Sequence, residues 1–139
     1  MEVRIAIEQP GEADLDVIHR ALAATYWSPG VPRDVVARGC ANAICAIARD
    51  GSGAVAGFAR VISDRASFAW LCDVFVVPAA QGRGVARGLV RALRAHPELQ
   101  GLRRWLLATR DAHGLYERYG FKPLDDHKHW LEKFDDRPR

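Results

Sequence analysis

The chain has 139 residues, 49% of them hydrophobic, which is enough for one compact domain and leaves little room for a second. The 20 basic and 17 acidic residues give a formal net charge of +3, too small an excess to indicate a nucleic-acid binder. Three cysteines without a C-x-x-C pair argue against a disulfide framework. The N-terminus lacks the pattern of a signal peptide, and no apolar run approaches the roughly 20 residues of a membrane span. We therefore expect a cytoplasmic protein that does not bind membranes.

The first third of the sequence predicts a strand followed by two helices. Polar and apolar residues alternate over residues 3–7, as in a half-buried strand. Apolar residues then recur at helical spacing from Leu15 to Tyr26, and Ser28-Pro29-Gly30 ends that helix. Pro32 can begin a second, short helix. The aromatic segment 26–33 has the Pro and Gly content of a loop that lines a site, so we expect it beside the substrate.

The middle of the chain predicts three antiparallel strands. Residues 44–48 and 54–62 are β-type runs separated by the hairpin signal Asp50-Gly51-Ser52-Gly53. Residues 67–77 are apolar at nearly every position, which predicts a central strand covered on both faces and ended by Pro78.

The remaining elements complete a layered α/β domain. A glycine-rich segment opens a helix with an apolar stripe at Val85, Leu89 and Leu93. A short strand over residues 105–108 and a helix that ends at Gly120 follow. Residues 121–124 and 129–134 then resemble a closing pair of strands. This order predicts a single domain over residues 1–139, with a mixed, mostly antiparallel sheet flanked by helices.

The glycine-rich turn is the segment most suited to bind an anion. Gly82 and Gly84 flank Arg83 directly after a strand and at the first turn of a helix. Amides without an intrahelical partner and the helix dipole attract phosphate there, and glycines let it approach the backbone. The segment lacks the lysine and serine or threonine of a nucleotide-triphosphate loop, and Arg87 replaces the third glycine of a dinucleotide-binding turn.

Two motifs resemble those of the GNAT acyltransferases. Gln81-Gly82-Arg83-Gly84-Val85-Ala86 resembles the [Gln/Arg]-x-x-Gly-x-[Gly/Ala] signature at each specified position. One strand later, residues 112–121 resemble the A-x-x-x-Y-x-x-x-G-F helix and turn of the family. The resemblance implies an acetyl-CoA-dependent N-acetyltransferase that acts by direct transfer in a ternary complex.

The same resemblance implies where acetyl-CoA binds. Main-chain groups of Phe75 and Val77 would pair with the pantetheine arm as another strand does, and the amides of residues 83–87 would hold the pyrophosphate. Tyr116 would protonate the departing thiolate as a general acid, unless it is only a core aromatic. Thr109 stands where many members carry asparagine. The implied cofactor-binding residues are Phe75, Val76, Val77, Gln81, Gly82, Arg83, Gly84, Val85, Ala86, Arg87, Thr109, Ala112 and Tyr116.

Transfer to an amine also requires that the amine lose its proton, because a free alkylamine has a pKa of about 10. Asp73 is the first candidate base, since it is the lone charge of an apolar strand; it could instead be the structural partner of Arg60 or Arg110. His113 is the second candidate. A water chain is the alternative to both. We do not assign a covalent role to Cys72, because cysteines in buried strands are usually inert.

Segment 26–33 supplies the candidate acceptor-binding residues. Tyr26 and Trp27 can face a cationic amine, and Arg33 can pair with a carboxylate, with Asp73 nearby. A small molecule, an amino acid or a peptide with a primary amine would suit such a site. The alternative is that the aromatic residues only pack the first helix onto the sheet and that Arg33 is solvated.

The sequence also leaves three alternatives to a transferase. The same fold could be a catalytically silent acyl-CoA sensor or interaction module. The row Arg83, Arg87, Arg91 and Arg94 could contact nucleic acid, although most such rows are merely solvated, and we expect no nucleic-acid partner. His127 and His129 lack the further ligands of a zinc site, so we expect no metal.

The two predicted C-terminal strands could offer an edge to a second copy of the chain in a homodimer.

Overall fold

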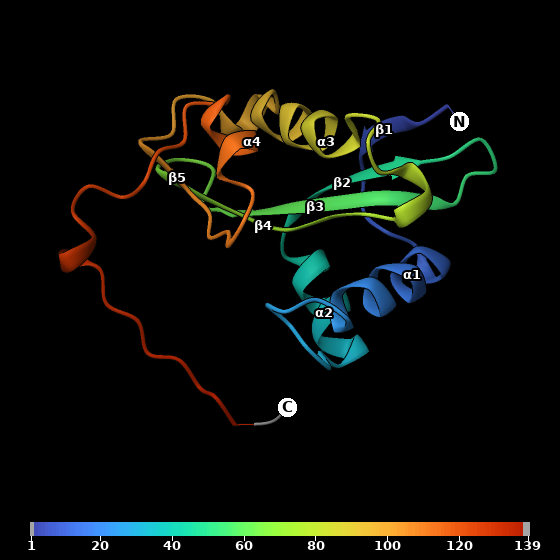
Figure 1. The fold of residues 1–139 in the computed structure, drawn as a ribbon, viewed down its shortest axis with the longest axis horizontal. Helices are drawn as coiled ribbons and strands as arrows, with labels where there is room; N and C mark the ends of the chain where they lie inside the picture. The colour runs from blue at the N-terminus through green and yellow to red at the C-terminus, as the bar shows by residue number, and fades with distance from the viewer. Residues whose placement is uncertain (1, 138–139) are drawn as a thin grey trace. The chain divides into compact units, whose positions relative to one another are not determined.

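A five-stranded mixed sheet is the framework of the fold in the computed structural model, which describes residues 2–137 (Figure 1). Its strands are β1 (Arg4–Ile7), β2 (Ile44–Arg49), β3 (Val55–Ser63), β4 (Phe68–Val76) and β5 (Arg104–Leu106), and they lie in that order across the sheet. The first four are antiparallel, and β5 is parallel to β4. The predicted fold class is therefore confirmed.

Helices cover both faces of this sheet. Helices α1 (Glu12–Ala23) and α2 (Arg33–Ala41) lie on one face, and α3 (Val85–Arg94) lies on the other (Figure 1). Leu15, Ile18 and Leu22 of α1 pack with Ile47 and Phe58 of the sheet in one buried cluster. The periodicity that predicts α1 is thus the periodicity of its buried face.

Small side chains form the floor on which α3 rests. Ala46 pairs with Ala59 and Ala48 pairs with Gly57 across β2 and β3, so these four residues share one face of the sheet. A Cβ atom on Gly57 would lie 3.1 Å from Val85 Cγ1 and 3.2 Å from Leu89 Cδ1. The absent side chain lets the first turn of α3 lie close to β3.

The first helix ends earlier than its apolar spacing predicts. Tyr26 lies beyond the end of α1 at Ala23, in the loop before α2. The hydroxyls of Thr25 and Ser28 donate to Leu22 O (2.7 and 2.9 Å), and the Gly30 amide donates to Ala23 O (2.9 Å). These bonds satisfy the last carbonyls of α1, so the helix stops there.

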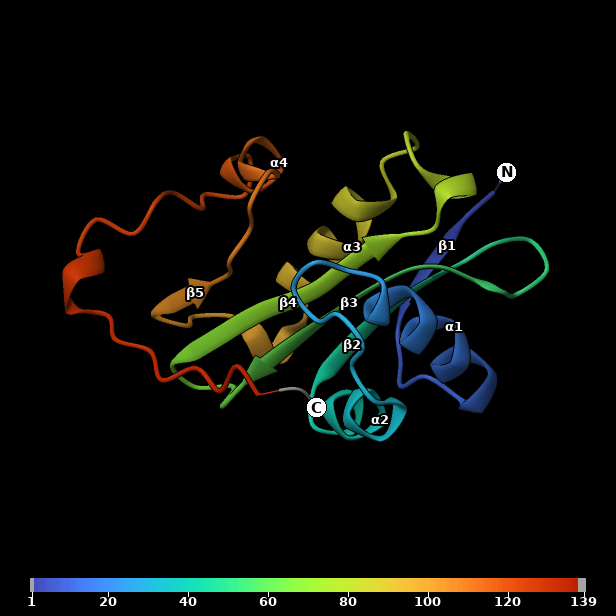
Figure 2. The same ribbon diagram turned by 60° about the horizontal axis from the view of Figure 1, so that its bottom comes forward.

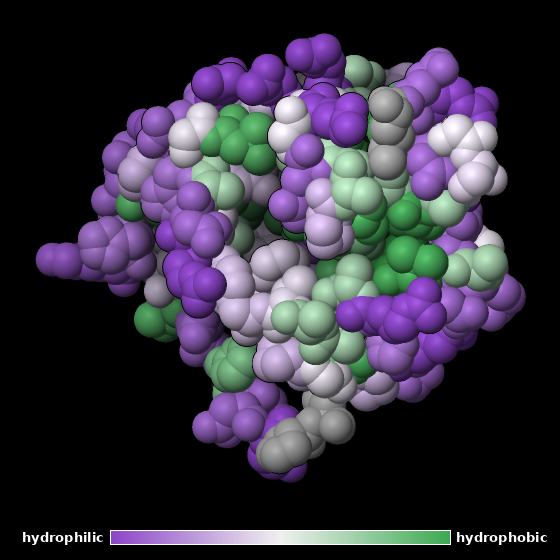
Figure 3. Space-filling model, turned by 45° about the vertical axis from the view of Figure 1, so that its right-hand side comes forward, coloured by the Kyte–Doolittle hydropathy of each residue, from purple (hydrophilic) through white to green (hydrophobic). Residues whose placement is uncertain are grey.

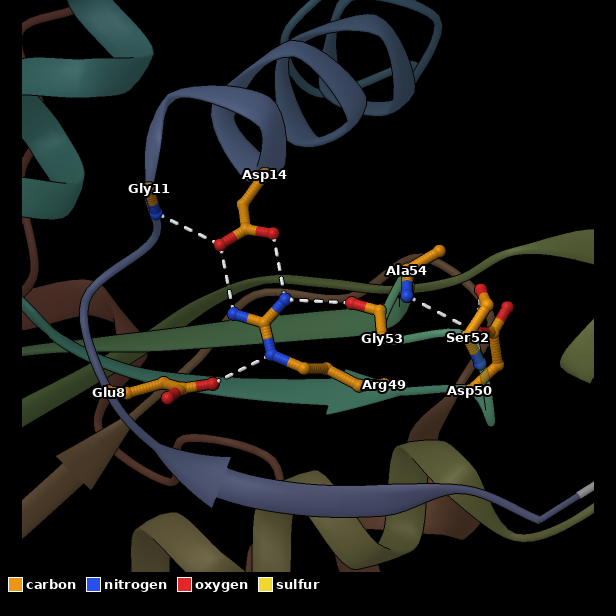
Figure 4. A network of polar contacts seen from close by, with 8 residues as sticks. All are labelled: Glu8, Gly11, Asp14, Arg49, Asp50, Ser52, Gly53 and Ala54. Carbon is orange, nitrogen blue, oxygen red and sulfur yellow. Dashed lines mark hydrogen bonds and ion pairs between the residues drawn. The ribbon is translucent and has the colours of Figure 1, made fainter.

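Arg49 at the end of β2 joins the start of α1 to the sheet (Figure 4). Its guanidinium donates to both carboxylate oxygens of Asp14 (2.8 and 2.9 Å), to Glu8 Oε1 (2.9 Å) and to Gly53 O (3.0 Å). Asp14 also accepts the amide of Gly11 at the helix start (2.9 Å). Arg49 therefore fixes three chain segments around one charge.

The chain divides into two compact parts that meet between Leu107 and Ala108. The second part contains the short helix α4 (His113–Glu117) and a 3₁₀ turn, η3 (His127–His129). The assignment of residues 1–139 to a single domain stays a prediction.

The predicted closing strands are wrong. No residue of 121–124 or 129–134 belongs to a strand, and His129 ends the 3₁₀ turn. A strand requires a partner that completes its hydrogen-bonded ladder, and alternation along one segment does not provide that partner.

The surface in Figure 3 is mainly hydrophilic, with small groups of hydrophobic residues between the polar ones. None of the helices within residues 2–137 has the length and hydropathy needed to cross a bilayer.

Candidate acyl-donor and acceptor site

The turn before α3 has the backbone geometry of an anion cradle. After β4 the chain forms a 3₁₀ turn, η1 (Pro78–Ala80), and reaches Gly82 and Gly84, whose φ angles are +78° and +77°. Gly84 is the N-cap of α3, and its carbonyl accepts the Gly88 amide (3.0 Å). Amides in the first turn of a helix have no intrahelical acceptor, and the helix dipole adds partial positive charge there.

Open space lies in front of both glycines. A Cβ atom at position 82 or 84 would meet no heavy atom of the described chain within 4 Å. Glycine is required here by the positive φ angles, not by crowding. The exposed Arg83 lies in the turn itself, and the exposed Arg87 and Arg91 lie four residues apart on α3. The turn therefore fits a phosphate group.

Strand β4 leads directly into this cradle and leaves part of one edge open. β5 pairs only with Phe68, Ala69 and Trp70, whereas β4 continues to Val76. None of the strands described in residues 2–137 pairs with that edge beyond Trp70. The prediction that both faces of β4 are covered holds only in part, because Ala69 and Leu71 are buried but residues 72–76 are only half-buried.

The open edge presents the main chain of Val76 rather than that of Val77. The Val77 amide donates to Ala56 O (2.9 Å), and Phe75 is paired with Phe58, so both residues direct their main-chain groups toward β3. Val76 O accepts Gln81 Nε2 (3.1 Å), which ties the glycine-rich turn back to the strand. Phe75 and Val77 are thus poorly oriented for the main-chain pairing that the sequence predicts, and Val76 is well oriented.

Asp73 lies at a bulge in β4 with a φ angle of +57°. Arg60 pairs with Cys72 and Phe58 pairs with Phe75, so β4 has one more residue than β3 between these pairs. Arg60 Nε donates to Asp73 Oδ2 (2.6 Å), and Trp27 Nε1 donates to Asp73 Oδ1 (3.0 Å). The structure thus gives Asp73 the arginine partner that was the alternative to its role as a base.

The loop between α1 and α2 places two aromatic rings near this bulge. Tyr26 and Trp27 are 46% and 44% exposed, and their ring centroids lie 5.0 Å apart in an edge-to-face arrangement. Figure 2 shows the loop passing in front of β3 and β4. Both rings are thus partly exposed to solvent.

Arg33 is already paired within the chain. Its guanidinium donates to Asp16 Oδ1 and to Glu12 Oε2, both at 2.9 Å, and to Glu12 O at 3.2 Å. These partners lie on α1, so Arg33 joins α2 to α1. The geometry does not favour the predicted pairing of Arg33 with a substrate carboxylate.

Comparisons with known proteins agree with this geometry. A family model described as an acetyltransferase (GNAT) domain matches residues 41–123. The chain belongs to the GNAT acetyltransferase family. The match includes β2 to β4, the glycine turn and the helix that carries Tyr116.

Individual relatives support the same family. A crystal structure from Xanthomonas campestris pv. campestris, assigned to the GNAT acetyltransferases, is 42% identical and has a TM-score of 0.90; the alignment covers 97% of this chain and 94% of that one. A Gibberella zeae protein named as an acetyltransferase is 28% identical over 129 residues, 77% of this chain and 72% of its own length. A Clostridium acetobutylicum structure, a predicted acetyltransferase solved with acetyl-CoA, shares the fold (TM-score 0.69, 17% identity, 96% and 95% covered).

The other predicted residues of this GNAT protein lie in the part after Ala108. Tyr116 is 8% exposed and its ring contacts that of Phe121 edge-to-face, with centroids 6.1 Å apart. Thr109 Oγ1 accepts the Ala112 amide (3.1 Å), and its carbonyl lies 3.2 Å from His113 Nε2. Thr109 therefore organises the start of α4. The sequence analysis noted only that many family members carry asparagine at this position and did not predict this role.

The described residues 2–137 contain no group of three or more His, Cys, Asp or Glu placed to hold a metal. His129 Nδ1 instead lies 2.6 Å from Asp126 Oδ2. The sequence analysis did not single out Gly57 and Gly88. Both have a structural role, because they allow α3 to approach the sheet.

Proposed function

We propose that this GNAT protein transfers the acetyl group of acetyl-CoA to a primary amine, by direct attack of the amine in a ternary complex. The observation that carries the proposal is the continuity between the open edge of β4 and the glycine cradle. About four residues of strand separate the bulge at Asp73 from Val77, a path of roughly 13 Å. An extended pantetheine arm fits such an edge while its pyrophosphate lies on the cradle.

Each part of this path has a role in the proposal. The amides of residues 83–87 hold the pyrophosphate, and the main-chain amide of Val76 faces the arm. Gln81 holds the cradle against the end of β4 through its bond to Val76 O. Arg83 supplies positive charge beside the phosphates. Acetyl-CoA supplies the acetyl group as an activated thioester.

The proposed proton transfers involve Tyr116 and either water or His113. Tyr116 protonates the departing thiolate as general acid, a role supported by its place in the A-x-x-x-Y-x-x-x-G-F motif. Proton removal from the amine falls to water or to His113, since the carboxylate oxygens of Asp73 already accept bonds from Arg60 and Trp27. Thr109 and Ala112 set the start of α4.

The proposed acceptor is a small molecule, an amino acid or a peptide with a primary amine. Exposed rings of Tyr26 and Trp27 attract a cationic amine through their faces. The ion pairs of Arg33 favour acceptors that do not need this arginine as a carboxylate partner.

The test measures thiol release from acetyl-CoA with a panel of amino acids, polyamines, aminoglycosides and peptides. Gly84→Glu should weaken acetyl-CoA binding by at least about tenfold, because its carboxylate would stand where phosphate binds. Tyr116→Phe should retain binding and lose about 10²-fold or more in kcat. Gly101→Glu is the matched control, since Gly101 also has a positive φ (+72°) and open space.

The outcomes separate the transferase from its alternative. Turnover with one class of amine that falls in both variants identifies the acceptor. Binding of acetyl-CoA without acetylation of any amine would favour the catalytically silent acyl-CoA sensor. Failure to bind coenzyme A would refute both.

A further inference from the structure

The bulge in β4 turns the Asp73 side chain toward the helices α1 and α2. Cys72 is paired with Arg60 on that side of the sheet, so in a regular strand residue 73 would point to the opposite face. The extra residue and the positive φ of Asp73 break this alternation. As a result its carboxylate reaches Arg60, whose Nη1 donates to Gly39 O of α2 (3.5 Å).

The same carboxylate reaches the loop between α1 and α2. Trp27 Nε1 donates to Asp73 Oδ1 at 3.0 Å across 46 residues of sequence. The side chains of Asp73 and Arg60 are only 12% and 19% exposed, whereas Trp27 is 44% exposed. A largely desolvated ion pair therefore holds one end of the indole and leaves the rest of the ring accessible.

Other bonds fix the two ends of this loop but not the indole. Thr25 and Ser28 bond to the end of α1, and His19 Nε2 lies 2.9 Å from Val31 O. Within residues 2–137, the polar contact of the Trp27 side chain is its hydrogen bond to Asp73. Its orientation at the bulge therefore depends on Asp73.

We propose that Asp73 is a positioning residue which, held by Arg60, fixes the indole of Trp27 at the β4 bulge and thereby makes Trp27 the residue that selects the amine acceptor. This inference rests on the proposed function, because it is the open edge of β4 next to the bulge that receives the thioester. It differs from a general-base role, in which Asp73 would itself take the proton of the amine.

Kinetics with Trp27→Phe and Asp73→Ala separate the two roles. Phenylalanine keeps an aromatic ring and the Arg60–Asp73 pair, and removes only the indole and its N–H. If Asp73 acts through Trp27, each variant should raise the acceptor KM by about tenfold, with kcat and the acetyl-CoA KM within about threefold of wild type. The double variant should be no worse than Asp73→Ala alone, because the two changes remove one interaction.

A base would give a different result. Loss of a general base costs about 10²- to 10⁴-fold in kcat with every amine, and it removes the corresponding limb of the pH profile. That result in Asp73→Ala, with normal kinetics in Trp27→Phe, would overturn the proposal. Unchanged kinetics in both variants would also overturn it. Glu98→Ala is the control, since it breaks the exposed Arg65–Glu98 pair (2.7 Å) elsewhere.

Hydrogen exchange gives a readout that needs no turnover. The indole N–H of Trp27, which donates to Asp73 Oδ1, should exchange about tenfold faster in Asp73→Ala than in wild type. Unchanged exchange would refute the positioning role even if the protein is active. If no amine is acetylated, the proposed function fails, while faster exchange would still show that Asp73 holds the indole of Trp27.

Discussion

Gly88 in α3 lies so close to Ile5 in β1 that a Cβ atom at position 88 would stand 2.5 Å from Ile5 Cδ1. The helix interior would otherwise favour alanine by about 1 kcal/mol. The close packing of α3 on the outer strand β1 therefore explains why position 88 is glycine, although glycine is a poor helix former.

This contact predicts that the effect of Gly88→Ala on the free energy of unfolding depends on the residue at position 5. In wild type the end of the Ile5 side chain must move to make room, which should offset the propensity gain, so the free energy of unfolding should change little. In an Ile5→Val background, which lacks Cδ1, the same change should raise it by about 1 kcal/mol. Urea unfolding of wild type, the two single variants and the double variant completes a double-mutant cycle. Additive effects of the two changes on the free energy of unfolding would contradict the predicted contact.

Gly57 couples the sheet to the glycine cradle. A Cβ atom there would lie 3.1 Å from Phe75 O, a backbone atom that cannot rotate away, and equally close to Val85 at the start of α3. We expect Gly57→Ala to lower the free energy of unfolding by about 1 to 3 kcal/mol and to weaken acetyl-CoA binding severalfold. Titration calorimetry would measure the affinity. Gly51→Ala, which meets no atom within 4 Å, should change neither quantity.

Much of the fold follows from local patterns in the sequence. Val85, Leu89 and Leu93 are buried at the spacing that predicts α3, and the run before Pro78 is β4. These patterns are informative because burial of one face imposes a period on the residues of that face. The glycine cradle is predictable for a related reason, since positive φ angles at Gly82 and Gly84 restrict the residue type.

The details of the site depend on contacts that a linear pattern does not contain. One extra residue at Asp73 decides which side chains of β4 face Arg60, and a one-residue shift exchanges the faces of a strand. The same shift exposes the main chain of Val76 in place of Val77. Arg33 finds Glu12 and Asp16 only after α1 and α2 pack together.

Cys72 tests whether transfer needs a covalent enzyme intermediate. Burial raises the pKa of its thiol to about 12, so almost no thiolate is present at neutral pH. We expect Cys72→Ala to retain kcat within about threefold, as direct transfer requires. Iodoacetamide should modify this thiol in unfolded protein much faster than in native protein, which peptide mass spectrometry can follow. Rapid native labelling together with an inactive alanine variant would instead support an acyl-enzyme.

Asp14 should contribute a pH-dependent part of the stability. The hydrogen bonds from Arg49 hold the pKa of this carboxyl below its ordinary value, and the Gly11 amide lowers it further against the opposing effect of burial. Because the folded pKa is depressed, the contribution is present above the unfolded pKa of about 3.9 and is lost as the pH falls below it toward the folded pKa. At pH 7, Asp14→Asn should lower the free energy of unfolding by about 1.5 to 3 kcal/mol. The difference from wild type should shrink below about pH 4 in urea unfolding.

Asp125→Asn is the control for this prediction. Lys122 also lowers the pKa of Asp125, but the side chains of Lys122 and Asp125 are 74% and 79% exposed, so solvent screens the pair. A difference for Asp14→Asn that stays constant from pH 7 to pH 3 would mean that its charge does not stabilise the fold.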